Sequence, residues 1–162
     1  MDYQIIDNFL PQEEYLKLYD LMTSSNFAWY YSDSVAFEES VDLGDWYQIH
    51  LLYIRLTPHS EHFLALLPIL EKLDIKALIR AKANFYPNLG KHIENDFHVD
   101  FPFQHKGCIY YLNTNNGPTI LSDGTKIDAI ANRALLFDPS KPHGSTHCTD
   151  AKVRLNINFN YF

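Results

Sequence analysis

Apolar residues recur at two different spacings along the chain, and the spacing changes near residue 79. Before that point, two stretches, 11–24 and about 59–73, show the three- and four-residue spacing of amphipathic helices. The apolar stripe of the first predicts packing on a sheet. Pro68 falls inside the second, so we expect that helix to kink or split there, because proline removes a backbone hydrogen bond and clashes with the preceding turn.

From residue 79 onward, short β-type runs alternate with turn signals rich in Gly, Pro, Asn and Asp, such as 115–118. The predicted strands are 79–86, 97–101, 107–112, 119–121, 133–137, 144–148 and 153–159. This succession predicts a mainly β fold with flanking helices, a double-stranded β-helix of the jelly-roll, cupin-like type, rather than a parallel α/β sheet.

Aromatic residues cluster between the two predicted helices, in 27–31 and 45–47, around an acidic, glycine-containing segment, 38–45. Long excursions of this kind are often functional. Two interpretations stay open: the rings belong to the core, or some of them line a substrate cleft or lid.

The net charge limits the kinds of binding partner that we expect, and the cysteines indicate the redox state of the compartment. The 162 residues carry a formal net charge of -7, which disfavours nucleic acid as a partner because sequence-independent binding depends on Lys and Arg clusters. Cys108 and Cys148 have no CxxC spacing, so we expect buried thiols in a reducing compartment. Without a signal-peptide pattern or a long apolar run, the sequence predicts a cytoplasmic protein with no membrane association.

The segment 97–101, Phe-His-Val-Asp-Phe, places an imidazole and a carboxylate two positions apart. In a strand, alternate side chains share a face, so His98 and Asp100 would lie side by side, with the three apolar residues on the other face. Two potential metal ligands are thus brought together.

A third ligand and an anion anchor follow downstream. His143 opens a predicted strand, and Arg154 comes 11 positions later. Two histidines and one carboxylate on one face of a metal leave the other positions open, as in non-haem Fe(II) oxygenases. A guanidinium nearby can bind a dicarboxylate through a bidentate, charge-assisted pair.

In this order, the residues resemble the Fe(II)/2-oxoglutarate-dependent dioxygenase superfamily, and in particular its prolyl-hydroxylase-like branch. Two further segments support the resemblance, Asn-Phe-Tyr-Pro at 84–87 and Cys-Ile-Tyr-Tyr-Leu-Asn at 108–113. The resemblance covers about residues 80–160. It implies one oxygenase domain over 1–162, with an N-terminal support region of about 1–78 and a catalytic β core of about 79–162.

The resemblance also implies cofactors and roles. Fe(II) would be bound by His98, Asp100 and His143, and the co-substrate 2-oxoglutarate by Arg154, Tyr111 and Tyr86. Together with O2, these would hydroxylate a C–H bond. A prolyl residue of a protein or peptide is the leading substrate, and a small molecule is the alternative.

Alternatives remain for the site and for the function. His147 competes with His143 for the third ligand position, but it lies only seven residues before Arg154, so we prefer His143. A cupin-like metal enzyme such as a zinc hydrolase, without 2-oxoglutarate, is one competing function. A non-catalytic jelly-roll binding module is another, and the four polar residues could also form a metal-free polar network.

Overall fold

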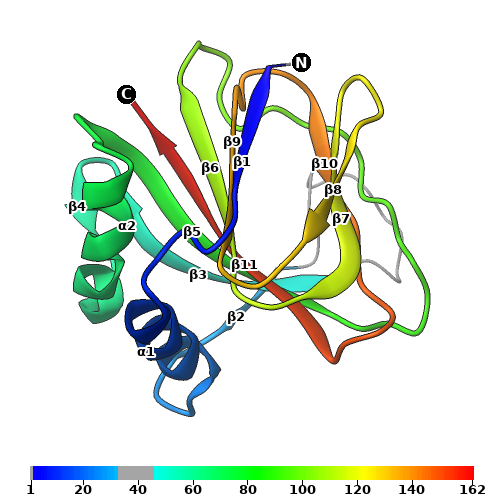
Figure 1. Ribbon diagram of the computed structural model, residues 1–162, viewed down its shortest axis with the longest axis horizontal. Coiled ribbons are helices and arrows are strands. Elements are labelled where there is room, and N and C mark those ends of the chain that lie inside the picture. The colour runs from blue at the N-terminus through cyan, green and yellow to red at the C-terminus, as the bar shows by residue number, and fades with distance from the viewer. Residues whose placement is uncertain (1, 33–45) are drawn as a thin grey trace.

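The computed structural model describes residues 2–32 and 46–162, which form two antiparallel sheets with helices on one side of the larger sheet (Figure 1). In chain order the elements are β1 (Tyr3–Ile6), α1 (Gln12–Thr23), β2 (Tyr30–Ser32), β3 (Tyr47–Ile54), β4 (Thr57–Pro58), the 3-10 helix η1 (Glu61–Leu66), α2 (Leu67–Lys72), β5 (Leu78–Pro87), β6 (Lys106–Tyr111), β7 (Asn115–Leu121), β8 (Lys126–Ala129), β9 (Arg133–Phe137), β10 (His143–Ser145) and β11 (Val153–Tyr161).

Strand pairing joins segments that are far apart in the sequence. The large sheet has the order β1-β9-β6-β11-β5-β3-β2, with β4 paired to β3, and the small sheet has the order β10-β7-β8. Strand β11 occupies the centre of the large sheet, antiparallel to both β5 and β6. The predicted double-stranded β-helix, mainly β with flanking helices, is confirmed.

Two hydrophobic clusters lie on opposite faces of the large sheet. On β6, Cys108 and Tyr110 belong to the cluster that the helices cover, whereas Ile109 and Tyr111 belong to the cluster shared with β7 and β8. Figure 1 shows α1 and α2 on one side of the large sheet and β7, β8 and β10 on the other. The helices therefore cover one face of the large sheet, and the small sheet covers the other.

Both predicted helical stretches are confirmed. Helix α1 agrees with the predicted 11–24 stretch within one residue at each end. The second stretch is split into η1 and α2, and Pro68 lies in the first turn of α2, where the missing N–H would have no helical partner in any case.

The segment 97–101 was predicted as a strand, and this prediction is wrong. Only His98 pairs, in an isolated bridge with His143, and Phe97 and Val99 are 42% and 40% exposed. A strand requires a continuous backbone partner, and here His98 pairs with His143 while the Asp100 N–H donates to the separate Pro139 carbonyl. Of the predicted strand 144–148, only 144–145 are in a strand, β10, and β3 was not predicted. The acidic segment 38–45 lies outside the described residues.

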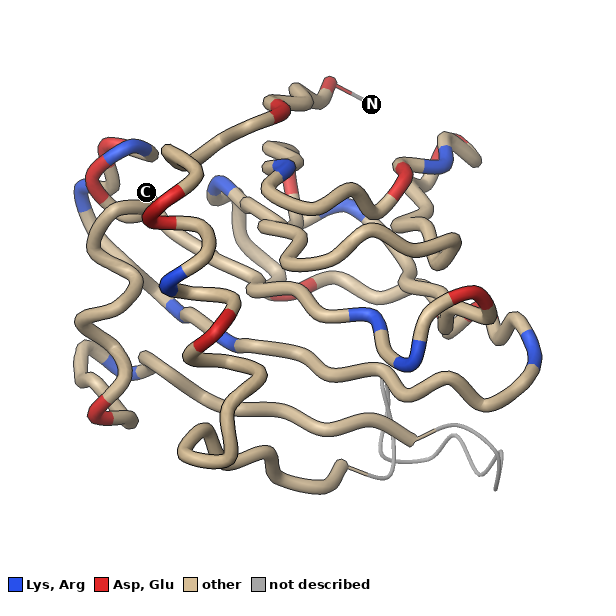
Figure 2. The backbone as a smooth tube through the Cα atoms, turned by 60° about the horizontal axis from the view of Figure 1, so that its bottom comes forward, with Lys and Arg blue, Asp and Glu red and all other residues tan. Residues whose placement is uncertain are grey.

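Charged residues of both signs are scattered along the described backbone, as Figure 2 shows. Cys108 and Cys148 are both buried and free, as predicted. No helix within 2–32 or 46–162 is long and apolar enough to span a membrane.

Truncation of the central strand should be costly. Ile157 on β11 is fully buried between α1, α2 and the sheet, so Ile157→Ala should lower the free energy of unfolding by about 2–5 kcal/mol. Leu64→Ala is the matched control, because Leu64 is 67% exposed, and it should change the free energy by less than about 0.5 kcal/mol. Urea denaturation followed by circular dichroism measures both; equal effects would contradict the assigned core.

Candidate active site

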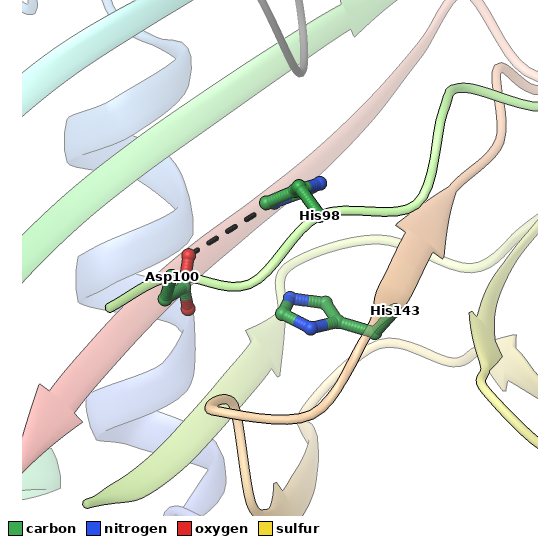
Figure 3. Close-up of side chains that lie close together, drawn as sticks. All are labelled: His98, Asp100 and His143. Carbon is green, nitrogen blue, oxygen red and sulfur yellow. Dashed lines mark ion pairs between the residues drawn. The ribbon is translucent and has the colours of Figure 1, made fainter. Parts of the chain in front are cut away.

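Three potential metal ligands converge between the sheets. The ligand atoms of His98, Asp100 and His143 all lie within 4.8 Å of one another. Figure 3 shows His98 and Asp100 extending from one loop and His143 from β10. Reciprocal backbone hydrogen bonds of 3.0 Å tie His98 to His143, which holds their ring centroids 4.8 Å apart. The backbone therefore prearranges the two imidazoles.

Both imidazoles present the nitrogen that a metal needs. Nδ1 of His98 lies 3.4 Å from the carbonyl oxygen of Asp96, and Nδ1 of His143 lies 3.1 Å from that of Lys141. Since a carbonyl oxygen only accepts, each Nδ1 carries the proton and each Nε2 keeps its lone pair. Burial and the nearby His143 lower the pKa of His98 to about 4. The ring is thus neutral at pH 7, the form that binds a metal.

Both carboxylate oxygens of Asp100 accept hydrogen bonds from neighbouring side chains. Arg80 Nη2 donates to Oδ1 at 2.6 Å, and the side-chain amides of Asn158 and Asn160 donate to Oδ2 at 3.1 and 2.8 Å. Burial raises the pKa of Asp100, but the Arg80 charge, His143 and the two amides outweigh it, so the net pKa is lowered and the carboxylate is ionised. Sequence reasoning did not find Arg80, Asn158 or Asn160.

A signal for these residues is present in the sequence. Polar residues occupy every second position in 154–160 and in 80–86, apart from the aromatic Tyr86. Such alternation is also typical of a solvent-exposed sheet face. Here the polar face is buried: Asn156, Asn158 and Asn160 are at most 7% exposed.

Removing one amide tests how the carboxylate is oriented. Asn160→Ala deletes the 2.8 Å hydrogen bond to Asp100, and loss of such a partner should weaken Fe(II) binding about 10- to 100-fold. Anaerobic calorimetric titration measures the affinity. Asn26→Ala, at an exposed position, is the control and should bind as the wild type does. Unchanged affinity in Asn160→Ala would contradict the orienting role.

Arg154 is buried between the sheets, and one nitrogen of its guanidinium has no hydrogen-bond partner among the described residues. It is 1% exposed; Nε donates to the Gly117 carbonyl at 2.8 Å and Nη2 to the Thr119 hydroxyl at 2.9 Å. Nη1 is buried and has no hydrogen-bond partner among the described residues. A Cβ at Gly117 would stand 2.9 Å from Arg154 Cδ, so glycine leaves room for the guanidinium. A buried cation with a spare N–H suits an anion.

Two tyrosines pack on this guanidinium. Arg154 Cζ lies 5.0 Å from the ring centroid of Tyr86 and 5.8 Å from that of Tyr111. The Tyr111 hydroxyl shares a 2.7 Å hydrogen bond with Thr119. Burial raises the pKa of both phenols, although the Arg154 charge opposes it. The neutral rings shield the guanidinium from water while leaving its charge uncompensated.

One pocket is lined by two of the three potential metal ligands and by Arg154. Its wall includes His98, His143, Tyr86, Thr119 and Arg154, and it encloses about 400 Å³ of empty space, the open mouth included. Two neutral imidazoles with one carboxylate suit Fe(II), and the unpartnered Arg154 Nη1 suits a carboxylate. The residues present therefore fit both a ferrous ion and 2-oxoglutarate.

The remaining histidines near the motif have other partners. His147, the competitor of His143, has Nδ1 2.9 Å from the carbonyl oxygen of Pro87, and its ring packs edge-on against Tyr86. His105 Nε2 lies 3.0 Å from the amide of Asn160. Among the described residues, the structure thus places His143 beside the other two ligands.

The aromatic clusters divide between the two interpretations given above. Phe27 is buried in the helix-side core. Tyr47 on β3 instead stacks on Tyr86, with ring centroids 5.3 Å apart. Tyr30 and Tyr31 are 60% and 68% exposed. Tyr47 therefore supports the pocket, and the other three residues do not.

Comparison with solved structures shows the same fold in oxygenases. A prolyl hydroxylase from Trichoplax adhaerens, solved with a hypoxia-inducible-factor peptide fragment, matches with a TM-score of 0.70 at 18% identity, over 99% of this chain and 83% of that one. A viral collagen prolyl hydroxylase from Paramecium bursaria Chlorella virus-1, solved with 2-oxoglutarate, matches with a TM-score of 0.63 at 13% identity, over 98% and 94%.

A third similar structure is the non-haem α-ketoglutarate-dependent epimerase SnoN of nogalamycin biosynthesis, with a TM-score of 0.67 at 14% identity over 99% of this chain and 77% of that one. No protein-family model matches the sequence, and no curated protein matches it by sequence. The resemblance predicted from the motif is confirmed in the fold. A hydroxylase and an epimerase share that fold, so the reaction must be argued from the site.

Proposed function

We propose that this protein is an Fe(II)- and 2-oxoglutarate-dependent dioxygenase that hydroxylates a C–H bond of its substrate. One observation carries the proposal: the two histidines of a convergent His-Asp-His set line the same pocket as a buried arginine with an unpartnered donor. A metal-free polar network would explain the ion pair of Asp100. It gives no reason for the unpartnered Nη1 of Arg154.

The residues of the chain have separate tasks. His98, Asp100 and His143 would hold the ferrous ion, and Arg154 would bind the distal carboxylate of 2-oxoglutarate. When bound, iron and 2-oxoglutarate supply the oxidation: one O2 is consumed, 2-oxoglutarate becomes succinate and carbon dioxide, and the C–H bond becomes C–OH. Tyr86 and Tyr111 keep water away from Arg154, which strengthens its attraction for the co-substrate.

A prolyl residue of a protein or peptide is the first substrate to test. Two similar structures are named prolyl hydroxylases, and one of them was solved with a peptide fragment. The motif in this chain points to the same branch. A small molecule is the second class to test.

Two measurements test the function. Anaerobic addition of Fe(II) and 2-oxoglutarate should produce a weak visible charge-transfer band, which a hydrolase or a binding module would not show. Succinate release should then rise with a substrate from a panel of prolyl peptides, amino acids and nucleosides. Absence of the band with a folded, iron-loaded protein would refute the proposal.

A further inference from the structure

An amine of the chain lies in the pocket wall without an anionic partner. Lys82 on β5 is partly buried and lines the pocket. Its ammonium lies 3.5 Å from the Tyr47 hydroxyl and 5.6 Å from the centroid of that ring. Within residues 2–32 and 46–162, no carboxylate forms an ion pair with it. Burial, with Arg80 nearby, lowers the pKa of Lys82 to about 8, and Asp100 opposes the shift.

Within residues 2–32 and 46–162, the charges around the pocket do not balance without a further anion. Arg80 neutralises Asp100, and a ferrous ion balances doubly charged 2-oxoglutarate. Arg154 and Lys82 remain as cations. The distal carboxylate of 2-oxoglutarate would contact Arg154. None of the groups named here supplies a carboxylate that pairs with Lys82. Burying an unpaired ammonium is unfavourable, so its retention in the pocket indicates a ligand that brings a negative charge.

A buried hydrogen-bond acceptor belongs to the residue paired with Lys82 across the sheet. Asn158 on β11 is the cross-strand partner of Lys82. Its side-chain N–H donates to Asp100 Oδ2, and because a carboxylate only accepts, this contact fixes the orientation of the amide. Oδ1 of Asn158 is then left buried with no partner among the described residues, in a side chain that lines the pocket and is 7% exposed.

We propose that Lys82 and Asn158 recognise the primary substrate, and that this substrate carries a carboxylate next to an N–H or O–H donor. The proposal rests on the oxygenase function given above and specifies the chemical class of its substrate. Lys82 binds the carboxylate, and Asn158 Oδ1 accepts from the donor. A free amino acid supplies both groups, and so does an acidic residue in a peptide.

The test compares carboxylates with the matched carboxamides. The full-length protein is loaded anaerobically with Fe(II) and 2-oxoglutarate, and the charge-transfer band is followed while each compound is added. One arm uses L-proline, L-prolinamide and the N,N-dimethyl betaine of proline, which lacks the donor. The other uses capped peptides that differ only by Asp or Asn, or by Glu or Gln. Whichever arm responds identifies the source of the carboxylate.

The variants connect the response to Lys82. In the wild type, the acid should shift the band at roughly 10- to 150-fold lower concentration than the amide, the range for a hydrogen bond to a charged group. Lys82→Met should abolish this difference and Lys82→Arg should retain most of it. Lys76→Met, at a surface lysine paired with Asp74, is the matched control and should behave as the wild type does.

Several outcomes would overturn the proposal. These are equal responses to acid and amide in the wild type, an unchanged difference in Lys82→Met, and no response to any acid while the band itself is intact. A large rise in the 2-oxoglutarate concentration that Lys82→Met requires would instead indicate that the Lys82 amine binds 2-oxoglutarate and not the primary substrate. Absence of the band in the wild type refutes the oxygenase function itself, because the band precedes any substrate.

Discussion

Replacing His143 with alanine should abolish Fe(II) binding. The change removes one of three converging ligands and leaves His98 and Asp100 alone to bind the ion. The loss should exceed the roughly 10- to 100-fold that follows removal of a hydrogen-bonding partner of a ligand. Anaerobic calorimetry with Fe(II) measures it, and the charge-transfer band with 2-oxoglutarate should disappear in parallel.

His147→Ala is the control, because His147 was the competing ligand in the sequence and is equally buried. Its Nδ1 is directed at the Pro87 carbonyl, so iron affinity should change little. Thermal denaturation establishes that both variants are folded. If His147→Ala lost iron while His143→Ala retained it, the assigned triad would be wrong.

Replacing Arg154 with methionine should raise the half-saturating concentration of 2-oxoglutarate by roughly 30-fold or more, since losing one partner of a buried, hydrogen-bonded charge pair costs about 2 kcal/mol or more. Iron affinity in the absence of 2-oxoglutarate should stay within about threefold, because Arg154 does not belong to the ligand triad. Titration of the charge-transfer band with 2-oxoglutarate gives the first quantity and calorimetry gives the second.

Arg55→Met is the matched control, because Arg55 is exposed in the turn between β3 and β4. It should leave the 2-oxoglutarate requirement as in the wild type. A wild-type requirement in Arg154→Met would show that the unpartnered Nη1 does not receive the co-substrate.

The sequence placed His98 and Asp100, the two candidate ligands, side by side for a partly wrong reason. A strand over 97–101 was expected to align His98 with Asp100, yet only His98 forms a β-bridge, with His143. The backbone N–H of Asp100 donates to the Pro139 carbonyl at 3.0 Å, so two separate backbone contacts hold the pair without a regular strand. The spacing of the ligands was therefore more informative than the secondary structure assigned to them.

The surroundings of the pair were not predictable from local pattern. Which face of β5 and β11 is buried depends on where the small sheet lies, and β5 and β11 themselves are joined by pairings between residues more than 50 positions apart. The sequence alone therefore does not distinguish a buried from an exposed position for Arg80 and Asn160. Strand β3 was missed because its apolar residues occur on both faces and a register shift interrupts it between Leu51 and Tyr53.

The position of β11 also constrains the order of assembly. It is the last strand of the described chain, yet it separates β5 from β6, which do not pair with each other. During synthesis, both neighbours leave the ribosome with an open edge that only residues 153–161 can fill. Closing the barrel, and with it bringing Arg154 to Thr119, must wait for this segment, and contacts of such long sequence separation form slowly.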